Sequence, residues 1–494
     1  MVPQGTRQPD TMATKLSSIG DLMQRHPVIA ALGLVALTLI AHVIILATPG
    51  FFAHDEWQKF DHVRLHGFQD FARAYGEIKA GPEFGYPMRP IGFLQQGVAS
   101  LWMESAPLLS HLIGVANHAI VALVFVWVLR RANVARTTAG VAGILFVLSP
   151  LTTMATGWVA ASFDQLYVLF LLLGAALIVR LPDERMSAPR AAGLLLATAA
   201  ALLSKEAAIA APVAVLLLGY LARIAHPDRF SWRPFGIAFI VVLLPVAAYL
   251  LLRASAISAS LAGHSDPAYT PDLWNVPGIV WRFFSFPFRI KLVEMSAGVF
   301  RSPWQPLAAV MVHFLLVGAV GWLFGLRFAL AYVAGYFVFL LPTLPLPNPG
   351  AHILYGSALA MSLAIAATLE RLLAMRHRRA AALVLAGVVA LYAHDLAIQV
   401  RLYEHGVCQA RFLTGLDTLL AQQAPGSQGI VVVLKDGELL RVANRAVAGR
   451  EPYTRDGNPV VTFDSADQQA GSATTRVRMT AACALLPEPP LAQE

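Results

Sequence analysis

Two carboxylates stand directly after the first long apolar segment of this sequence. Asp55 and Glu56 belong to the stretch "FFAHDEWQKFDHVRLHGF", which follows the apolar residues 28–48. A carboxylate in this position can act as a general base toward a hydroxyl or an amine, or it can bind a divalent cation. The alternative is a solvated loop or a cap on the first helix. The pair is therefore a candidate catalytic pair and, if a metal ion is used, its candidate ligand set.

Charged and aromatic residues recur at the ends of later apolar segments. Arg89 and Lys205 suit a phosphate group, since a guanidinium can bind two phosphate oxygens at once. Lys205 could instead form an ion pair with its neighbour Glu206, and Asp164 could serve only as a cap for the helix that follows it. The remaining candidates are His111, His118, Trp158, His352 and Tyr355. Of these, His111 and His118 could equally hydrogen-bond within a helix bundle.

The composition shows what kind of protein must position these residues. The chain has 494 residues, of which 57% are hydrophobic and 13% charged, whereas a soluble domain carries about 25% charged residues. Apolar segments near 20 residues recur along most of the chain, which predicts a polytopic α-helical membrane protein. These segments are continuous and do not alternate, which disfavours a β-barrel. In such a protein the net charge of +8 concerns topology and does not indicate a nucleic-acid partner.

The basic residues predict the orientation of the chain. Arg and Lys recur in every second connection between the apolar segments, as the positive-inside rule requires. This alternation predicts about 11 transmembrane helices, with a cytoplasmic tail at 1–27, a membrane domain at 28–400 and an extracytoplasmic domain at 401–494. The loops at 49–107 and 253–304 then lie outside. The predicted spans are 28–48, 108–129, 137–156, 164–180, 190–204, 207–223, 235–252, 305–326, 328–346, 352–372 and 380–400.

Two outer segments break the simple pattern. The segment Arg89–Met103 is too short to span, and we interpret it as a re-entrant or interfacial helix. The segment Trp281–Trp304 carries Arg282, Arg289 and Lys291 among aromatic residues, which is typical of a helix in the headgroup layer. Such a helix either contacts membrane lipid phosphates only or captures a phosphorylated lipid substrate.

The tail has a different composition from the membrane domain. "YEHGVCQARFLTGLDTLLAQQA" predicts an amphipathic helix, "IVVVLKDGELLRV" predicts a strand, an Asp-Gly turn and a second strand, and "TRVRMTAACALL" predicts a further strand. These elements form a small mixed α/β domain. It contains the only two cysteines, Cys408 and Cys483. They form either a disulfide, as an oxidising compartment favours, or two unpaired buried thiols.

The order of the motifs resembles that of the GT-C glycosyltransferases, and in particular the protein O-mannosyltransferase-like branch that includes the tetratricopeptide-bearing mannosyltransferases. The resemblance covers roughly residues 28–225. No tetratricopeptide array follows, and His352 and Ile353 replace a Glu-Arg pair of a late family segment. The matching positions are Asp55-Glu56, Tyr86 with Arg89-Pro90, His111 to His118, Trp158 to Leu166, and Ser204 to Glu206.

The resemblance implies inverting transfer of a sugar from a polyprenyl-phosphate donor to an extracytoplasmic acceptor, which is an envelope glycan, a lipid or a protein. Asp55 would be the base or would orient the acceptor, and Glu56 would assist it or hold a divalent cation. Arg89 and Lys205 would neutralise the departing phosphate. Two other classes stay open: a transporter or flippase of lipid-linked sugars, and a non-catalytic scaffold. The Ala- and Arg-rich composition favours a bacterial inner membrane, with the acceptor in the periplasm.

Overall fold

The computed structural model describes residues 26–51, 54–76, 88–182, 184–261, 271–285, 304–347, 350–422, 429–434, 437–455, 458–464 and 475–487. The helices of the membrane part are α2 Pro27–Ala41, α3 Val43–Leu46, α4 His54–His66, α5 Phe68–Gly76, α6 Pro90–Ser100, α7 Pro107–Arg131, α8 Arg136–Val147, α9 Thr153–Gly157, α10 Ser162–Ile178, α11 Ala188–Ser204, α12 Ala211–Ala225, α13 Trp232–Leu252, α14 Ala254–Leu261, α15 Val276–Ser285, α16 Trp304–Phe324, α17 Leu326–Val338 and α18 Ser357–Ala374. Short 3₁₀ helices are η1 Val159–Ala161, η2 Glu206–Ala210, η4 Leu273–Asn275, η6 Leu341–Thr343 and η7 Ala351–Tyr355. The remaining elements are α19 Arg378–Gln422, β1 Ile430–Val433, α20 Gly437–Val447, η8 Glu451–Tyr453, β2 Thr454–Arg455, β3 Asn458–Pro459, β4 Val461–Asp464, β5 Thr475–Met479 and β6 Leu485–Pro487.

The apolar helices match the predicted spans. Among the described residues, six helical segments are long and apolar enough to cross a membrane, and five shorter apolar helices accompany them. Each of the eleven predicted ranges overlaps one of these helices. The prediction of a polytopic helical membrane protein with a small C-terminal mixed α/β domain is therefore confirmed.

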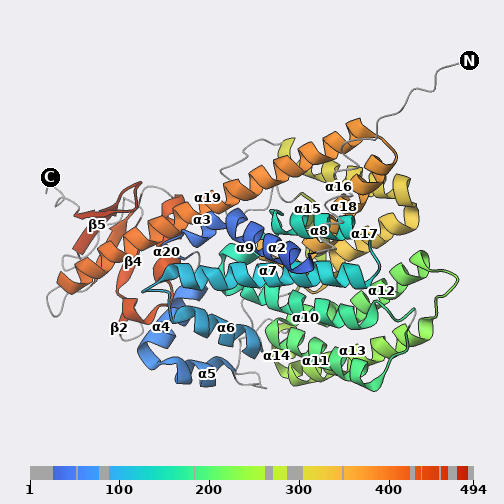
Figure 1. Cartoon of the computed structure of the whole chain (residues 1–494). Helices are drawn as coiled ribbons and strands as arrows, with labels where there is room; N and C mark the ends of the chain where they lie inside the picture. The colour runs from blue at the N-terminus through green and yellow to red at the C-terminus, as the bar shows by residue number, and fades with distance from the viewer. Residues whose placement is uncertain are drawn as a thin grey trace, which may run out of the picture.

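The helices pack side by side into an elongated bundle (Figure 1). Helix α10 lies between α7 and α11, and α18 packs on α8. Their shared core contains the fully buried rings of Phe146, Tyr167, Tyr336 and Tyr355. These helices thus form a fixed frame from which the loops at either end project.

Three short helices, α4, α5 and α6, lie at the end of the bundle that also carries the C-terminal sheet (Figure 1). Helix α6 occupies the segment predicted as a re-entrant or interfacial helix. Helix α15 begins at Val276, five residues before the predicted start at Trp281. The rest of that predicted helix, including Arg289 and Lys291, lies outside the described residues, as does Tyr86.

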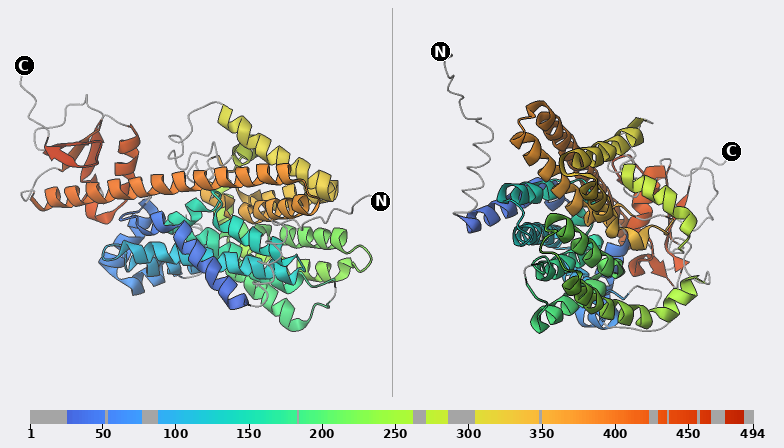
Figure 2. Two further views of the ribbon diagram at one scale, coloured as in Figure 1. Left: turned by 45° about the horizontal axis from the view of Figure 1, so that its top comes forward. Right: turned by 90° about the vertical axis from the view of Figure 1, so that its right-hand side faces the viewer.

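Helix α19 connects the membrane part to the tail. It has 45 residues without a break, so the predicted domain boundary at 401 and the predicted separate amphipathic helix both fall inside one helix. The helix runs along the length of the bundle and reaches the sheet at its far end (Figure 2).

The tail is a small α/β domain with strand order β4-β1-β5-β6. Strand β1 pairs in parallel with β4 and β5, and β6 is antiparallel to β5. The predicted hairpin after Val433 is wrong, because α20 follows β1 there. The spacing of Val442, Ala443 and Ala446 gives this segment one apolar helical face, which is buried in the domain core. A disulfide between Cys408 and Cys483 joins α19 to the turn between β5 and β6.

Candidate active site

The start of a helix is the common location of four predicted site residues. Arg89 is the residue before α6, Asp164 lies in the first turn of α10, Glu206 opens η2 ahead of α12, and His352 lies in η7 ahead of α18. A helix N-terminus carries a partial positive charge from its unpaired N–H groups. The bundle therefore brings several such ends to one place, which favours a negatively charged ligand there.

Two ion pairs join these helix starts. The Nζ of Lys205 lies 2.6 and 2.7 Å from the two carboxylate oxygens of Asp164. The Nε of Arg89 donates to Oε2 of Glu206 at 2.6 Å, and a second guanidinium nitrogen contacts Oε1. The alternative of an ion pair between Lys205 and Glu206 is thus wrong, since each pairs with a residue from another element. Asp164 also does more than cap a helix, because its side chain bonds Lys205.

The two pairs differ in their access to solvent. Lys205 and Asp164 are 6% and 1% exposed, whereas Arg89 and Glu206 are 18% and 39% exposed. Burial lowers the pKa of Arg89, but the charge and hydrogen bond of Glu206 together with the charges of Asp164 and Tyr249 raise it by more, so the pKa lies above its ordinary value. The guanidinium is therefore charged and remains accessible to a ligand at the edge of the group.

Aromatic rings and one glycine hold the group in place. The ring of His352 meets that of Trp158 edge-on at 4.9 Å between centroids, and its Nε2 lies 3.8 Å from Asp164. The guanidinium of Arg89 lies 5.1 Å from the centre of the Phe163 ring. A side chain at Gly92 would collide with that ring, so the glycine lets α6 pack close to the start of α10.

The acidic pair predicted as catalytic lies on α4. Glu56 is buried, and its Oε1 accepts a hydrogen bond of 2.7 Å from the backbone N–H of Val159. Asp55 is half-buried. Burial lowers the pKa of Lys59, the Asp55 charge raises it, and the Arg89 charge lowers it. Helix α4 is thus bonded to the turn after Trp158 and lies within electrostatic range of the Arg89 pair.

The remaining predicted residues make hydrogen bonds away from the two ion pairs. His118 Nδ1 and the Tyr355 hydroxyl are 2.8 Å apart in the core, and His111 Nε2 donates to the carbonyl of Gly50 at 3.0 Å. Both histidines therefore hold the bundle together, as the structural alternative proposed. Arg282 donates to the carbonyl of Pro347 at 3.1 Å.

The described residues offer little for a metal ion. No group of three or more His, Cys, Asp or Glu side chains in this part of the chain could hold one. The carboxylate of Glu56 already accepts from a backbone N–H. No catalytic step is therefore assigned to a metal.

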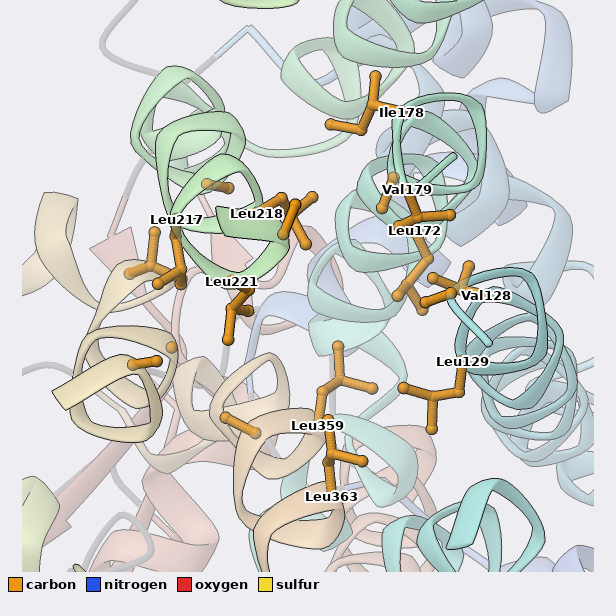
Figure 3. A pocket seen from close by; sticks show the side chains of 18 of the residues that line it. Val128, Leu129, Leu172, Ile178, Val179, Leu217, Leu218, Leu221, Leu359 and Leu363 are labelled. Carbon is orange, nitrogen blue, oxygen red and sulfur yellow. The ribbon is translucent and has the colours of Figure 1, made fainter. Parts of the chain in front are cut away.

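A large apolar cavity of about 520 Å³ lies between α7, α10, α12, α17 and α18. Leucine, isoleucine and valine side chains from α7, α10, α12 and α18 surround it (Figure 3). Its lining begins at Ala211, the first residue after η2, and at Phe170, which lies about 9 Å along α10 from Asp164. The cavity therefore starts close to the two ion pairs and has the size of a small-molecule site, about 300–1,000 Å³.

Sequence reasoning missed two buried polar groups. Asp61 on α4 pairs with Arg450, and Asp395 inside α19 accepts from Thr153 and from Gln399. An ionisable residue within an apolar span is a usable signal for Asp395. Nothing in the local sequence connects Asp61 with a residue 389 positions away.

Comparison with known proteins gives a fold likeness only. No protein-family model matches the chain, and no curated protein matches it. Solved structures similar to it include ArnT from Cupriavidus metallidurans bound to undecaprenyl phosphate, at 16% identity and a TM-score of 0.46, covering 88% of this chain and 86% of that one. The Archaeoglobus fulgidus oligosaccharyltransferase is similar at 12% identity and a TM-score of 0.44, covering 83% of this chain. The arabinofuranosyltransferase AftD from Mycobacteria is similar at 16% identity and a TM-score of 0.42, covering 90%.

The chain spans 64% of the length of the oligosaccharyltransferase and 32% of that of AftD. The function proposed below rests on the geometry of the site and on the sequence motifs.

Proposed function

We propose that this chain is a GT-C-like membrane glycosyltransferase. It transfers a sugar from a polyprenyl-phosphate donor to an acceptor in the periplasm, with the donor phosphate at Arg89 and Lys205. We place it in the bacterial inner membrane, with the N-terminus in the cytoplasm and the C-terminal domain outside. The relationship to the O-mannosyltransferase-like branch belongs to this proposal.

One observation carries the proposal. Two basic side chains, Arg89 before α6 and Lys205 at the α11–η2 junction, lie at converging helix N-termini, and the lining of an apolar cavity begins nearby at Ala211. A lipid-linked sugar has a matching charged part and apolar part, since its phosphate needs positive charge and its isoprenoid chain needs an apolar space. Each basic side chain is paired with a carboxylate, which keeps the charge stable in the absence of the ligand.

The proposed reaction is one displacement at the anomeric carbon of the donor sugar. An acceptor hydroxyl oxygen bonds to the anomeric carbon while the bond from that carbon to the phosphate oxygen breaks. The hydroxyl proton passes to the Asp55 carboxylate, and the electron pair leaves with the polyprenyl phosphate. Arg89 and Lys205 stabilise the negative charge that develops on the phosphate. A single displacement of this kind inverts the anomeric configuration.

The cavity takes the proximal isoprenoid units of the donor. Among its lining, the side chains drawn in Figure 3 are aliphatic, including Leu172 on α10 and Leu218 on α12. Burying such a chain contributes about 25 cal/mol per Å² of apolar surface. This contribution helps to hold the donor with its phosphate at the ion pairs.

The test is turnover by the full-length chain in liposomes. Polyprenyl-phosphate sugars are supplied with candidate glycan, lipid and peptide acceptors, and free polyprenyl phosphate and glycosylated product are measured. The proposal expects both products. Movement of the intact donor between leaflets without either product would show a transporter instead, and no movement and no product would favour a scaffold.

A further inference from the structure

The C-terminal domain has a second contact with the membrane part besides α19. Helix α4, which carries Asp55, lies between the two. Glu56 and Lys59 face the membrane part, where Glu56 bonds Val159. Trp57 packs in a core cluster that joins the C-terminal domain to Ala99 and Met103 of the membrane part, and it donates through Nε1 to Gln409 on α19 at 3.0 Å. The opposite faces of one short helix are therefore buried by two different domains.

An ion pair fastens the tail side of this helix. The Nε of Arg450 donates to Oδ2 of Asp61 at 2.6 Å, and its second terminal nitrogen donates to Oδ1 at 3.0 Å. The side chains of Arg450 and Asp61 are 4% and 2% exposed. The guanidinium lies 4.7 Å from the centre of the Trp57 ring and 4.8 Å from that of Tyr453. A third nitrogen donates to the carbonyl of Ala446.

Helix α19 also packs closely against the segment that precedes α4. A side chain at Gly50 would collide with the backbone of Gly406 on α19, and one at Gly406 would collide with Thr48. The disulfide two residues beyond Gly406 ties the same stretch of α19 to the sheet. The tail is thus attached to both ends of the segment that presents Asp55.

We propose that Arg450 is a positioning residue for sugar transfer. It holds α4, and through α4 the Asp55 carboxylate, at the distance from the donor that proton transfer requires. The inference rests on the proposed function, and it assigns the C-terminal domain a part in the reaction. Neither Arg450 nor Asp61 touches the ion pairs of Arg89 and Lys205 in the described structure.

The experiment compares Arg450→Gln with wild type in the full-length chain. A misplacement of about 1 Å can cost about 100-fold in rate, so we expect kcat for acceptor transfer to fall by about that factor. The KM for the donor is expected to stay unchanged, because Arg89 and Lys205 lie on other helices. Hydrogen exchange at the backbone amides of α4 is expected to accelerate. Arg478→Gln, an exposed arginine of the same domain, is the matched control and should change none of these.

The outcomes separate the two proposals. A wild-type kcat in Arg450→Gln, or a donor KM that rises as much as kcat falls, would overturn the positioning role. Should Arg450→Gln fail to fold, Arg450→Lys keeps the charge without the two-point contact, and it should lie between wild type and the expected loss. A wild-type protein that transfers no sugar contradicts the proposed function only. Hydrogen exchange in Arg450→Gln still tests the role of Arg450 in holding α4: accelerated exchange in α4 supports that role, and unchanged exchange rejects it.

Discussion

Two arginine–carboxylate pairs of the same chemistry stand at opposite sides of α4. The Arg89–Glu206 pair has a second cation nearby and part of its surface exposed, and the lining of the apolar cavity begins at Ala211, just after η2. The Arg450–Asp61 pair is enclosed by two aromatic rings and a carbonyl, and it is almost fully buried. The pair type alone therefore does not tell a ligand site from a structural contact. The surroundings differ, because only the first pair is partly exposed.

The largest effect is expected for Asp55, which lies between the two pairs. Asp55→Asn keeps the shape of the side chain but removes most of its basicity, and general-base assistance is typically worth ~10²–10⁴-fold. Turnover should fall within that range while donor binding stays intact. Asp228→Asn, an exposed aspartate after α12, is the control and should retain activity. Near-normal transfer by Asp55→Asn would remove this residue from the mechanism.

The stability of the two pairs should differ next. Asp61→Asn leaves the buried Arg450 charge without its carboxylate, which should cost about 3–5 kcal/mol. Glu206→Gln affects a partly exposed pair and should cost about 0–1 kcal/mol. Thermal denaturation of the purified variants in detergent measures both. Equal losses would mean that the two pairs have the same structural weight, and the comparison would fail.

Lys205→Ala tests the ligand side of the comparison. Removing one group that stabilises developing charge typically costs ~10²–10³-fold in kcat. The donor KM should also rise, because the phosphate carries charge in the ground state as well. Steady-state kinetics at varied donor concentration measures both parameters, with Arg327→Ala, an exposed arginine of α17, as the control. A loss of kcat without any change in KM would place Lys205 away from the bound phosphate.

The smallest change, a single accessible thiol, tests which side each region faces. The positive-inside pattern predicts that residue 378 is cytoplasmic and residue 437 is outside. Both Arg378 and Gly437 are exposed, and the native cysteines are bonded to one another. In intact cells, an impermeant thiol reagent should label Gly437→Cys but not Arg378→Cys. The reverse pattern would put the Arg450 contact in the cytoplasm, where the proposed acceptor is absent.

The membrane part could be predicted from the sequence because its signals are local. A run of apolar residues predicts a span wherever it stands, so each predicted range overlaps an apolar helix. The Asp436-Gly437 turn signal failed for the converse reason. The parallel partners of β1 come from residues 461–464 and 475–479, and no local pattern shows that α20 must cross back over the sheet to reach them.

The site was predictable in its members but not in its pairing. Residue type and position singled out Arg89, Asp164, Lys205 and Glu206, yet Lys205 bonds a carboxylate 41 residues earlier and not its neighbour. Packing of α10 against α11 decides that choice. The Arg450 contact was missed entirely, because it depends on how a separate domain docks on α4.

Because α19 is unbroken, its length fixes how the tail is rotated about the helix axis relative to the membrane part. Its 45 residues correspond to about 67 Å, more than twice the ~30 Å of a bilayer core. One residue added or lost between the membrane and Gly406 would turn everything beyond it by about 100° and shift it by only about 1.5 Å. Gly406 would then no longer face Gly50, and Arg450 would point away from Asp61. The number of residues in this part of α19 therefore matters more than their identity for the angle at which the tail meets α4.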